Sequence, residues 1–401
     1  MRTTLFCSAV DVADCGPDGI LDDALGRAGV DGLSVAASYH AARDLLPHAS
    51  GPRLRSFPAG LWIARDPAVW DGCPVQPIRA GDDETEAAVA ALVAAGRERG
   101  AAVDGWSVFM HVDADRPGPG AHVDAFGTAF AEQLCPARPA SRAYAVALAR
   151  ALVRAGLTEV LAESLHHHGL EHGVHHERLL FEPGPVGRFL LGLCLCDACI
   201  AGADALGVDG AVLRDDVRIL LEGMFERGEP LPGDVGTRAD AAALLDGRMG
   251  ALLDAREAAV TSLVGEVARA CADEGGALTV LDSSGAAKGY ADGRPTGAPA
   301  IEIGWRFGLD VAALSAHCTV EAIAYARDPA RVALDLEAYR AAIGERPLAA
   351  IVRPFGPDCD GVDDLRAKAD LARAAGCTRL DLYHYGLMPL PVLDRIAEAL
   401  A

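Results

Sequence analysis

Short apolar segments alternate with alanine-rich segments along almost the whole chain, and this alternation limits the possible folds more than any other feature. Eight apolar segments are predicted strands, at residues 3–10, 32–38, 105–112, 158–164, 277–283, 318–325, 347–353 and 378–384. Strands that alternate with helices form parallel sheets covered by helices. Eight such units predict an α/β protein with a single (β/α)8 TIM-barrel domain over residues 1–401.

Helices are predicted between the strands, at residues 84–99, 140–155, 240–274, 330–343, 362–375 and 390–400. Two connections are longer than a minimal barrel needs. Residues 40–104 follow strand two and contain a candidate ninth strand at 55–64. Residues 165–276 follow strand four and are expected to form an insertion with a histidine-rich loop, a cysteine cluster and helices. Long insertions after barrel strands build the rim of the active site in this fold.

Composition and charge exclude several classes of protein. Of the 401 residues, 51% are hydrophobic and 23% are charged, which is typical of a globular protein. The net charge of −21 argues against nucleic acid and membrane surfaces as partners, because both are anionic. No apolar segment is long enough to span a bilayer, and the first residues lack a signal-peptide pattern. We therefore expect a cytoplasmic protein with a small-molecule substrate. The oligomeric state is not predicted.

Strand four supplies the strongest candidate for a catalytic residue. The segment TEVLAES, residues 158–164, is apolar and ends on Glu163. In a (β/α)8 barrel, catalytic groups lie at the carboxyl ends of the strands. Apolar neighbours raise the pKa of a carboxyl group by desolvation, which suits a proton donor. Glu163 is therefore the predicted proton donor.

Cleavage of a glycosidic bond usually requires a second carboxyl group as nucleophile or base. Glu321 in strand six and Asp282 at the end of strand five are the predicted catalytic candidates. Asp358 and Asp360, in the loop after strand seven, are further options. An equal alternative for Glu321 is a buried ion pair with Arg353.

Other polar residues at the predicted strand ends indicate a binding pocket. The predicted substrate-binding residues are Tyr39, His40, His111, His166, Arg353, Tyr383 and Tyr385. Phenols, imidazoles and a guanidinium together can donate and accept hydrogen bonds to many hydroxyl groups. The pattern favours a carbohydrate-like substrate.

Histidines and cysteines after strand four raise the question of a metal. His166, His167, His168, His172, His175 and His176 follow Glu163 without the HExxH spacing of zinc proteases. We interpret them as an active-site loop with one or two functional histidines. The CLCDAC segment is more specific, because Cys194, Cys196 and Cys199 can occupy three corners of a zinc tetrahedron. Cys135 is the predicted fourth ligand, and four cysteines would make the zinc structural. No organic cofactor is predicted.

These segments resemble a known group of enzymes. LAES at the end of strand four, followed by CLCDAC and preceded by Cys135, resembles the glycoside hydrolase clan of (β/α)8 barrels. It is similar to the zinc-bearing family 42 β-galactosidases, whose catalytic domain carries a four-cysteine zinc site near the barrel mouth. The segments LDLYHYGLMPL and AASYHAARDLLPH also look like uncharacterised actinobacterial proteins described as hypothetical glycosyl hydrolases.

The resemblance implies roles for several residues. It assigns the proton donor to Glu163 and the zinc ligands to the four cysteines. The clan places a nucleophilic Glu after strand seven, where this sequence has Arg353, and an Asn before the proton donor, where it has Ala162. Inversion, substrate assistance or a departure from hydrolysis would each explain the missing nucleophile.

Three functions remain open from the sequence. The first is a glycoside-hydrolase-like enzyme that acts on a small saccharide or glycoside. The second is a barrel lyase or isomerase that uses histidines and a metal on a sugar-like acid or phosphate, with His111, His166 and Arg353 as the central residues. The third is a saccharide-binding barrel without catalysis, because the missing nucleophile is compatible with lost activity.

Overall fold

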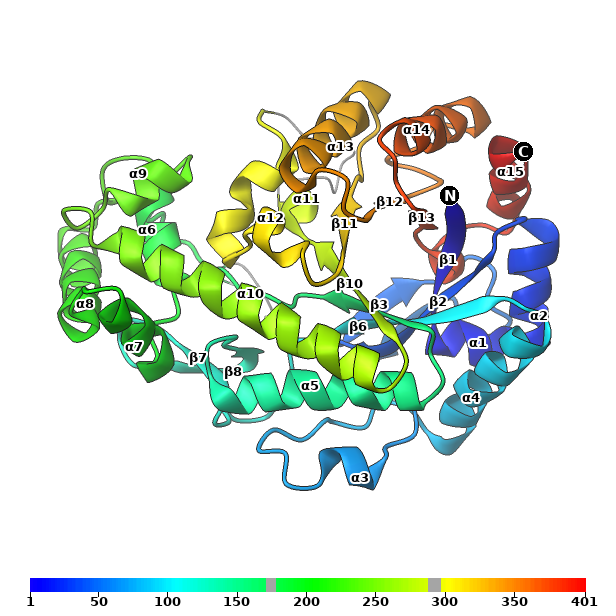
Figure 1. Cartoon of the computed structure of the whole chain (residues 1–401), viewed down its shortest axis with the longest axis horizontal. Coiled ribbons are helices and arrows are strands. Elements are labelled where there is room, and N and C mark those ends of the chain that lie inside the picture. The colour runs from blue at the N-terminus through cyan, green and yellow to red at the C-terminus, as the bar shows by residue number, and fades with distance from the viewer. Residues whose placement is uncertain (171–177, 288–296) are drawn as a thin grey trace.

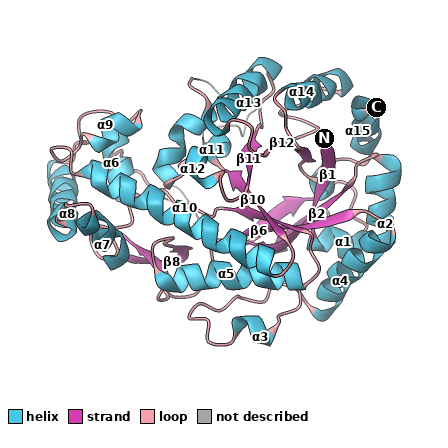
Figure 2. Ribbon diagram, in the orientation of Figure 1, coloured by secondary structure: helices cyan, strands magenta, loops and turns pink. Residues whose placement is uncertain are grey.

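The chain folds into a closed (β/α)8 barrel in the computed structural model, which describes residues 1–170, 178–287 and 297–401. The ring closes because β1 (Arg2–Ser8) pairs in parallel with both β13 (Arg379–Leu382) and β2 (Gly32–Tyr39). The other barrel strands are β6 (Ala102–Val108), β9 (Glu159–Glu163), β10 (Ala277–Asp282), β11 (Thr319–Ile323) and β12 (Leu348–Val352). Figure 2 shows these strands ringed by helices. The predicted fold class is confirmed.

Helices cover the outside of the barrel and, apart from the start of α10, match the predicted segments within a few residues. They are α4 (Asp83–Glu98), α5 (Pro139–Arg154), α10 (Met249–Asp273), α13 (Pro329–Ile343), α14 (Val362–Ala374) and α15 (Pro391–Leu400). Short helices α1 (Ala9–Cys15) and α2 (Pro17–Leu21) follow β1. Side chains of Asp82 and Asp328 cap α4 and α13 by accepting hydrogen bonds from backbone N–H groups. Within the described residues, no helix combines the length and apolar character needed to cross a membrane.

The predicted ninth strand at 55–64 is wrong as a continuous element. β4 (Leu54–Phe57) forms a hairpin with β3 (Ala42–Leu45), whereas β5 (Gly60–Leu61) pairs antiparallel with β2. Pro58 lies between β4 and β5 and has no backbone N–H to donate to a neighbouring strand. The segment is therefore divided between the hairpin and the edge of the barrel.

The connection between β9 and β10 carries a group of helices beside the barrel. These are α6 (Gly184–Leu191), α7 (Asp197–Ala205), α8 (Gly210–Arg227) and α9 (Arg238–Ala242). In Figure 1 they gather at the left, and α10 extends from them to α5. They have a separate apolar core that includes Leu221, Met224 and Leu253. The single helix predicted at 240–274 is wrong in part, because Leu245 and Asp246 adopt left-handed backbone conformations that separate α9 from α10.

The interior of the barrel is layered because successive side chains of a strand point to opposite faces. The middle layer is apolar and contains Phe6, Ala36, Trp106, Leu161, Leu281, Ile323 and Ile351. Beneath it, Arg379 forms ion pairs with Glu159 at 2.8 Å, Asp381 at 2.7 Å and Glu321 at 3.5 Å. The carboxyl ends of the strands lie on the other side of the apolar layer, so polar groups there are separated from this ionic floor.

Replacing Arg379 tests the structural role of the floor. Arg379→Leu removes the cation from the buried carboxyl groups of Glu321 and Asp381. It should lower the free energy of unfolding by about 3–5 kcal/mol, measured by urea denaturation. Arg373→Leu is the control, because its ion pair with Asp370 on α14 is exposed and should contribute about 0–1 kcal/mol. Equal losses in the two variants would contradict a stabilising role for the floor.

Candidate active site

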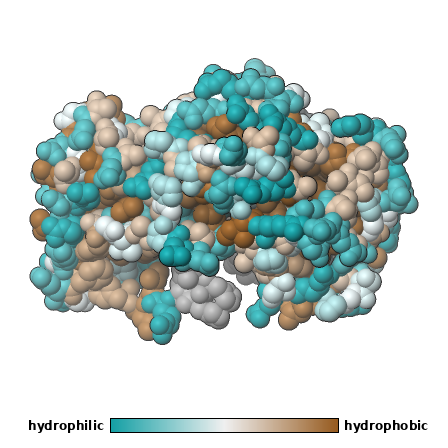
Figure 3. All heavy atoms as spheres, turned by 90° about the horizontal axis from the view of Figure 1, so that it is seen from below, coloured by the Kyte–Doolittle hydropathy of each residue, from teal (hydrophilic) through white to brown (hydrophobic). Residues whose placement is uncertain are grey.

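A cavity of about 800 Å³ opens at the carboxyl ends of the barrel strands. One wall is the barrel mouth, with Glu163, Tyr325, Arg353 and other strand-end residues. The opposite wall comes from the loop after β9, from α6 and α10, and from the 3₁₀ helix η3 (Ala300–Phe307). This volume is typical of small-molecule sites, which span about 300–1,000 Å³. Figure 3 shows the molecule from below, where hydrophilic side chains alternate with apolar patches.

Glu163 lies at the mouth because of strand alternation. Its neighbour two residues back, Leu161, belongs to the apolar layer, so Glu163 shares the same inward face one level higher. The Glu163 carboxylate accepts a hydrogen bond of 2.7 Å from Trp106 Nε1. Burial raises the pKa of Glu163, whereas the His40 charge and the Trp106 hydrogen bond act in the opposite direction. The carboxyl group is therefore held closer to its neutral, proton-donating form.

Aromatic rings surround the Glu163 carboxyl group. Trp106 contacts Tyr39 with ring centroids 4.4 Å apart, Phe6 at 5.0 Å and Tyr383 at 5.7 Å. All four line the cavity. Aromatic side chains combine a flat apolar face with, in Tyr and Trp, a polar group at the edge. The mouth can therefore contact the apolar face of a ring-shaped ligand while hydrogen-bonding its polar groups.

His166 and Arg353 also reach the cavity, as the sequence predicts. His166 Nδ1 lies 2.7 Å from the backbone oxygen of His167, and Nε2 has no partner within the described residues. Burial lowers the pKa of His166, which favours a neutral ring whose Nε2 can accept a hydrogen bond. The Arg353 guanidinium pairs with Asp358 and lies 4.5 Å from the centre of the Tyr325 ring. Asp358 is thereby occupied as a counter-ion rather than presented to the cavity.

Three predicted binding residues lie outside this main cavity. His40 lines an adjoining recess, and His111 lies next to it, with ring centroids 6.0 Å apart and His111 Nε2 3.4 Å from Asp113. Tyr385 belongs to the turn η4 (Tyr385–Leu387) and donates a hydrogen bond of 2.7 Å to Asp23. A substrate-binding role for Tyr385 is not supported.

The structure also separates the predicted second carboxyl groups from the cavity. Glu321 is fully buried in the ionic floor, two residues below Ile323 of the apolar layer, and pairs with Arg379 rather than Arg353. Asp282 has the opposite alternation to Leu281, so it points outward and accepts a hydrogen bond of 2.7 Å from Tyr339. Asp360 pairs with Arg327 on the surface. These expectations are corrected: among the described residues that line the main cavity, Glu163 is the single carboxylic acid.

A further carboxyl group, Asp44 of β3, lines the adjoining recess of about 150 Å³. This recess shares Tyr39, Trp106 and Tyr383 with the main cavity. Burial and the nearby Asp11 charge raise the pKa of Asp44. Burial raises the pKa of Tyr383, and the charges of Glu163 and Asp44 raise it further, so the phenol lies within electrostatic reach of the two carboxyl groups. Asp44 follows the end of β2 by five residues, and it was not predicted as a site residue because it lies within the β3–β4 hairpin rather than at the strand end itself.

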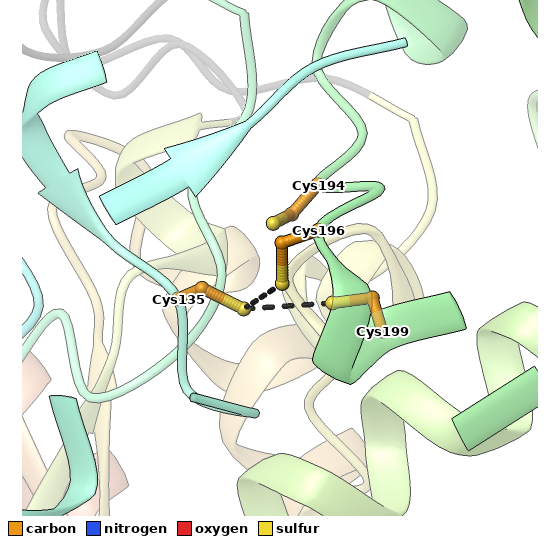
Figure 4. A group of neighbouring side chains, drawn as sticks. All are labelled: Cys135, Cys194, Cys196 and Cys199. Carbon is orange, nitrogen blue, oxygen red and sulfur yellow. Dashed lines mark hydrogen bonds between the residues drawn. The ribbon is translucent and has the colours of Figure 1, made fainter. Parts of the chain in front are cut away.

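The four predicted metal ligands come together in a buried cluster (Figure 4). Cys135 follows β8 (Ala129–Leu134), Cys194 and Cys196 lie between α6 and α7, and Cys199 is in the first turn of α7. Their sulfur atoms all lie within 4.8 Å of one another, and Cys135 Sγ is 3.5 Å from Cys199 Sγ and 3.7 Å from Cys196 Sγ. A tetrahedral site with metal–sulfur bonds of about 2.3 Å requires sulfur atoms about 3.8 Å apart.

The chemistry of the cysteine cluster fits a metal ion. Burial raises the pKa of the Cys135 thiol, whereas hydrogen bonds, led by that from Cys135, lower the pKa of Cys196. One thiolate is thus stabilised at the expense of its neighbours. A cation at the centre would favour all four thiolates together.

In its described part, the histidine-rich segment contributes buried rings but no comparable cluster. His168 Nε2 lies 2.9 Å from the backbone oxygen of Met110, and burial holds the pKa of His167 well below its usual range. Among residues 1–170, 178–287 and 297–401, the four cysteines are the single group of three or more potential ligands close enough to hold one metal ion. His172, His175 and His176 lie outside the described residues.

Comparisons with known proteins agree with this fold. No protein-family model matches the sequence, and a search of curated proteins gave no match. Among solved structures, a β-amylase catalytic domain from Paenibacillus polymyxa aligns with a TM-score of 0.51 and 12% identity, over 98% of this chain and 94% of that chain. A β-galactosidase from Marinomonas ef1 aligns with a TM-score of 0.51 and 10% identity, over 100% of this chain but 59% of that chain.

A class V chitinase from Pseudomonas fluorescens Pf-5 aligns with a TM-score of 0.50 and 8% identity, over 100% of this chain and 99% of that chain. The structural neighbours are thus glycoside hydrolase (β/α)8 barrels. At these identities the similarity establishes the fold.

The hydrogen bond between Trp106 and Glu163 can be tested without a substrate. Trp106→Phe removes a donor that stabilises the carboxylate, so the pKa of Glu163 should rise further. The measurement is a pH titration of the Glu163 carboxyl ¹³C signal by NMR. Trp70→Phe is the matched control, because Trp70 is buried beside α5 and away from the cavity. An unchanged or lower midpoint in Trp106→Phe would contradict the assigned interaction.

Proposed function

We propose that this protein is a glycoside-hydrolase-like enzyme in which Glu163 protonates the leaving oxygen of a small saccharide or glycoside. The observation that carries the proposal is a carboxyl group, with its pKa raised by burial, at the mouth of a barrel and against an aromatic cavity of about 800 Å³. Its position at the end of β9 is where this fold presents catalytic groups. The β-amylase, β-galactosidase and chitinase that share the fold support a carbohydrate substrate.

The site supplies the requirements of general acid catalysis. In the neutral form, Glu163 donates its proton to the glycosidic oxygen as the bond to the sugar carbon breaks, and the carboxylate remains. The Trp106 hydrogen bond and the nearby His40 stabilise that carboxylate. Arg353, fixed by Asp358 and Tyr325, and neutral His166 are positioned to bind polar groups of the sugar.

Asp44 is our candidate for the second carboxyl group. It lies in the recess that adjoins the main cavity beside Trp106 and Tyr383. A carboxylate there can activate water or attack the sugar carbon, and the configuration of the product distinguishes these roles. This choice replaces Glu321 and Asp282.

Glu163→Gln tests the central role. Turnover of aryl glycosides should fall by about 10²–10⁴-fold because the amide cannot donate the proton, while saccharide binding is retained. Hydrolysis is measured over a panel of both anomers and binding by calorimetry. Glu274→Gln is the control, because Glu274 pairs with Arg154 on the surface after α10.

The other outcomes are equally informative. Loss of turnover in Asp44→Asn with binding retained would support its role as the second carboxyl group. If Glu163→Gln hydrolysed the glycosides at the wild-type rate, the assignment of Glu163 as the proton donor would be contradicted. Saccharide binding without turnover by the wild-type protein over the whole panel would instead favour the non-catalytic barrel.

We further propose that the cysteine cluster binds a structural Zn²⁺ ion. Cys135, Cys194, Cys196 and Cys199 would complete the coordination shell and leave no open position for a substrate. The resemblance to family 42 implies these four zinc ligands, and the zinc would join the hairpin of β7 (Ala121–Val123) and β8 to the helices of the insertion. Reduced thiols at the site suit a cytoplasmic location.

Metal analysis of the purified protein should find about one zinc per chain. Cys196→Ser should lose the metal and lower the melting temperature, because the metal stabilises only the folded state. Cys377→Ser is the control, since Cys377 is buried outside the cluster. A wild-type protein that carries no zinc after expression in zinc-supplemented medium would contradict the proposal.

A further inference from the structure

One buried arginine in the cavity wall has no role in the function proposed above. Arg256 of α10 is 2% exposed and lines the main cavity. Its Nη2 donates a hydrogen bond of 2.9 Å to the backbone oxygen of Arg306. Within the part of the chain that the structure describes, its Nε and Nη1 atoms have no hydrogen-bond partner and no carboxylate forms an ion pair with it. A buried guanidinium with unused donors is costly unless a ligand supplies the acceptors.

The segment around Arg256 is fixed by close backbone packing. Gly308, which follows η3, has a φ of +74°, and a Cβ there would lie 3.1 Å from the Arg256 backbone oxygen and 3.1 Å from a ring carbon of His167. The His167 N–H donates to the Phe307 oxygen at 3.0 Å. The end of η3 is thus held directly against α10 and the loop after β9. This packing positions Arg256 before any ligand binds.

Further positive charge lies in the same wall. Arg306 of η3 lines the cavity, donates to the Val235 oxygen at 2.7 Å and lies 5.2 Å from the centre of the Trp305 ring. Arg188 of α6 also lines the cavity and pairs with Glu182 at 2.6 Å. The described lining therefore contains four arginines, with Arg353 at the mouth, against the single acid Glu163.

Arg188 and Arg353 have carboxylate partners in Glu182 and Asp358, so the positive charge that matters here is that of Arg256, with Arg306 beside it. The chain has 57 acidic and 36 basic residues, with a net charge of −21. A buried arginine without a carboxylate partner in the described residues therefore stands out against this acidic background. A cavity enriched in one charge attracts ligands of the opposite charge.

We propose that the substrate carries an oxyanion group, a carboxylate or a sulfate or phosphate ester, and that Arg256 binds this group with Arg306 beside it. The proposal deepens the proposed function and rests on it, because it adds a charged substituent to the saccharide. The guanidinium plane presents paired N–H donors that match two oxygens of such a group. Glu163 and Arg256 both line the cavity. Glu163 would act on the bond that breaks, and Arg256 would bind the substituent that fixes the orientation of the sugar.

The alternative to ligand binding is that Arg256 has a structural role. The cysteine cluster lies close enough for its thiolates to act on the charge of Arg256. A counter-ion for a metal-thiolate cluster would contribute to metal retention and stability but would not discriminate between ligands. The two roles therefore predict different measurements.

The test compares sugars that differ only in the charged group. Binding of glucuronate and galacturonate is compared with that of glucose and galactose, with sulfate and phosphate esters as further arms. Hydrolysis of the matching aryl glycosides is measured in parallel. The wild-type protein should bind the anionic member of a pair more tightly, and the best arm identifies the oxyanion. Arg256→Gln should weaken binding of that member about 10–100-fold and change the neutral member less than about twofold.

Controls separate folding from recognition. Arg269 lies on the exposed side of the same helix, so Arg269→Gln should change the binding of neither the anionic nor the neutral sugar. Arg256→Lys keeps the charge and should recover part of the preference, and Arg306→Gln provides a second variant if Arg256→Gln is unstable. Zinc content and melting temperature are recorded for every variant.

The outcomes distinguish this inference from the proposed hydrolysis. Binding of acidic sugars that depends on Arg256, without turnover, would support the oxyanion site and contradict the enzyme. Hydrolysis of neutral glycosides with no preference for anionic ones would overturn the oxyanion site and leave the enzyme intact. Loss of zinc and stability in Arg256→Gln, with equal effects on neutral and anionic sugars, would assign Arg256 to the cysteine cluster instead.

Discussion

Alternation of side chains in a closed ring of strands is the constraint on which the rest of this structure depends. Each barrel strand can direct only every second side chain to the interior. In β9 this places Glu159 in the ionic floor, Leu161 in the apolar layer and Glu163 at the mouth. The apolar layer separates the two carboxyl groups, so one belongs to a permanent ion pair while the other faces the cavity and can change its protonation.

The same alternation explains which parts of the fold and the site could be predicted from the sequence and which could not. The eight strands and the position of Glu163 could be predicted, because buried apolar runs and strand ends are local signals. Asp282 and Glu321 were predicted wrongly as cavity residues. Asp282 has the wrong alternation relative to Leu281, and Glu321 lies below Ile323 rather than above it. Both errors concern the level or face of a residue, which depends on the register of closed strands.

Arg256 and Arg306 of the cavity wall could not be predicted as site residues, for a different reason. The cysteines could be grouped because their spacing has a recognised chemistry. Arg256 and Arg306 are 50 residues apart in the sequence, and neither lies in a recognised motif. They meet only because η3 packs on α10, and that packing is a tertiary property. Trp106 could have been found, since it lies in the predicted strand 105–112 and its side chain belongs to the apolar layer of the barrel interior.

Helix α10 connects the functional parts of the molecule. Its contacts extend from the insertion helices α7 and α9 to the barrel helix α5, and Arg256 lies along it at the cavity. The cysteine cluster, the arginine wall and the barrel are therefore parts of one framework. A crystal structure of Glu163→Gln with a bound acidic oligosaccharide tests this account most directly. We predict a glycosidic oxygen within hydrogen-bond distance of residue 163 and the oxyanion against Arg256. A saccharide bound outside this cavity, or with its oxyanion away from Arg256, would contradict the account.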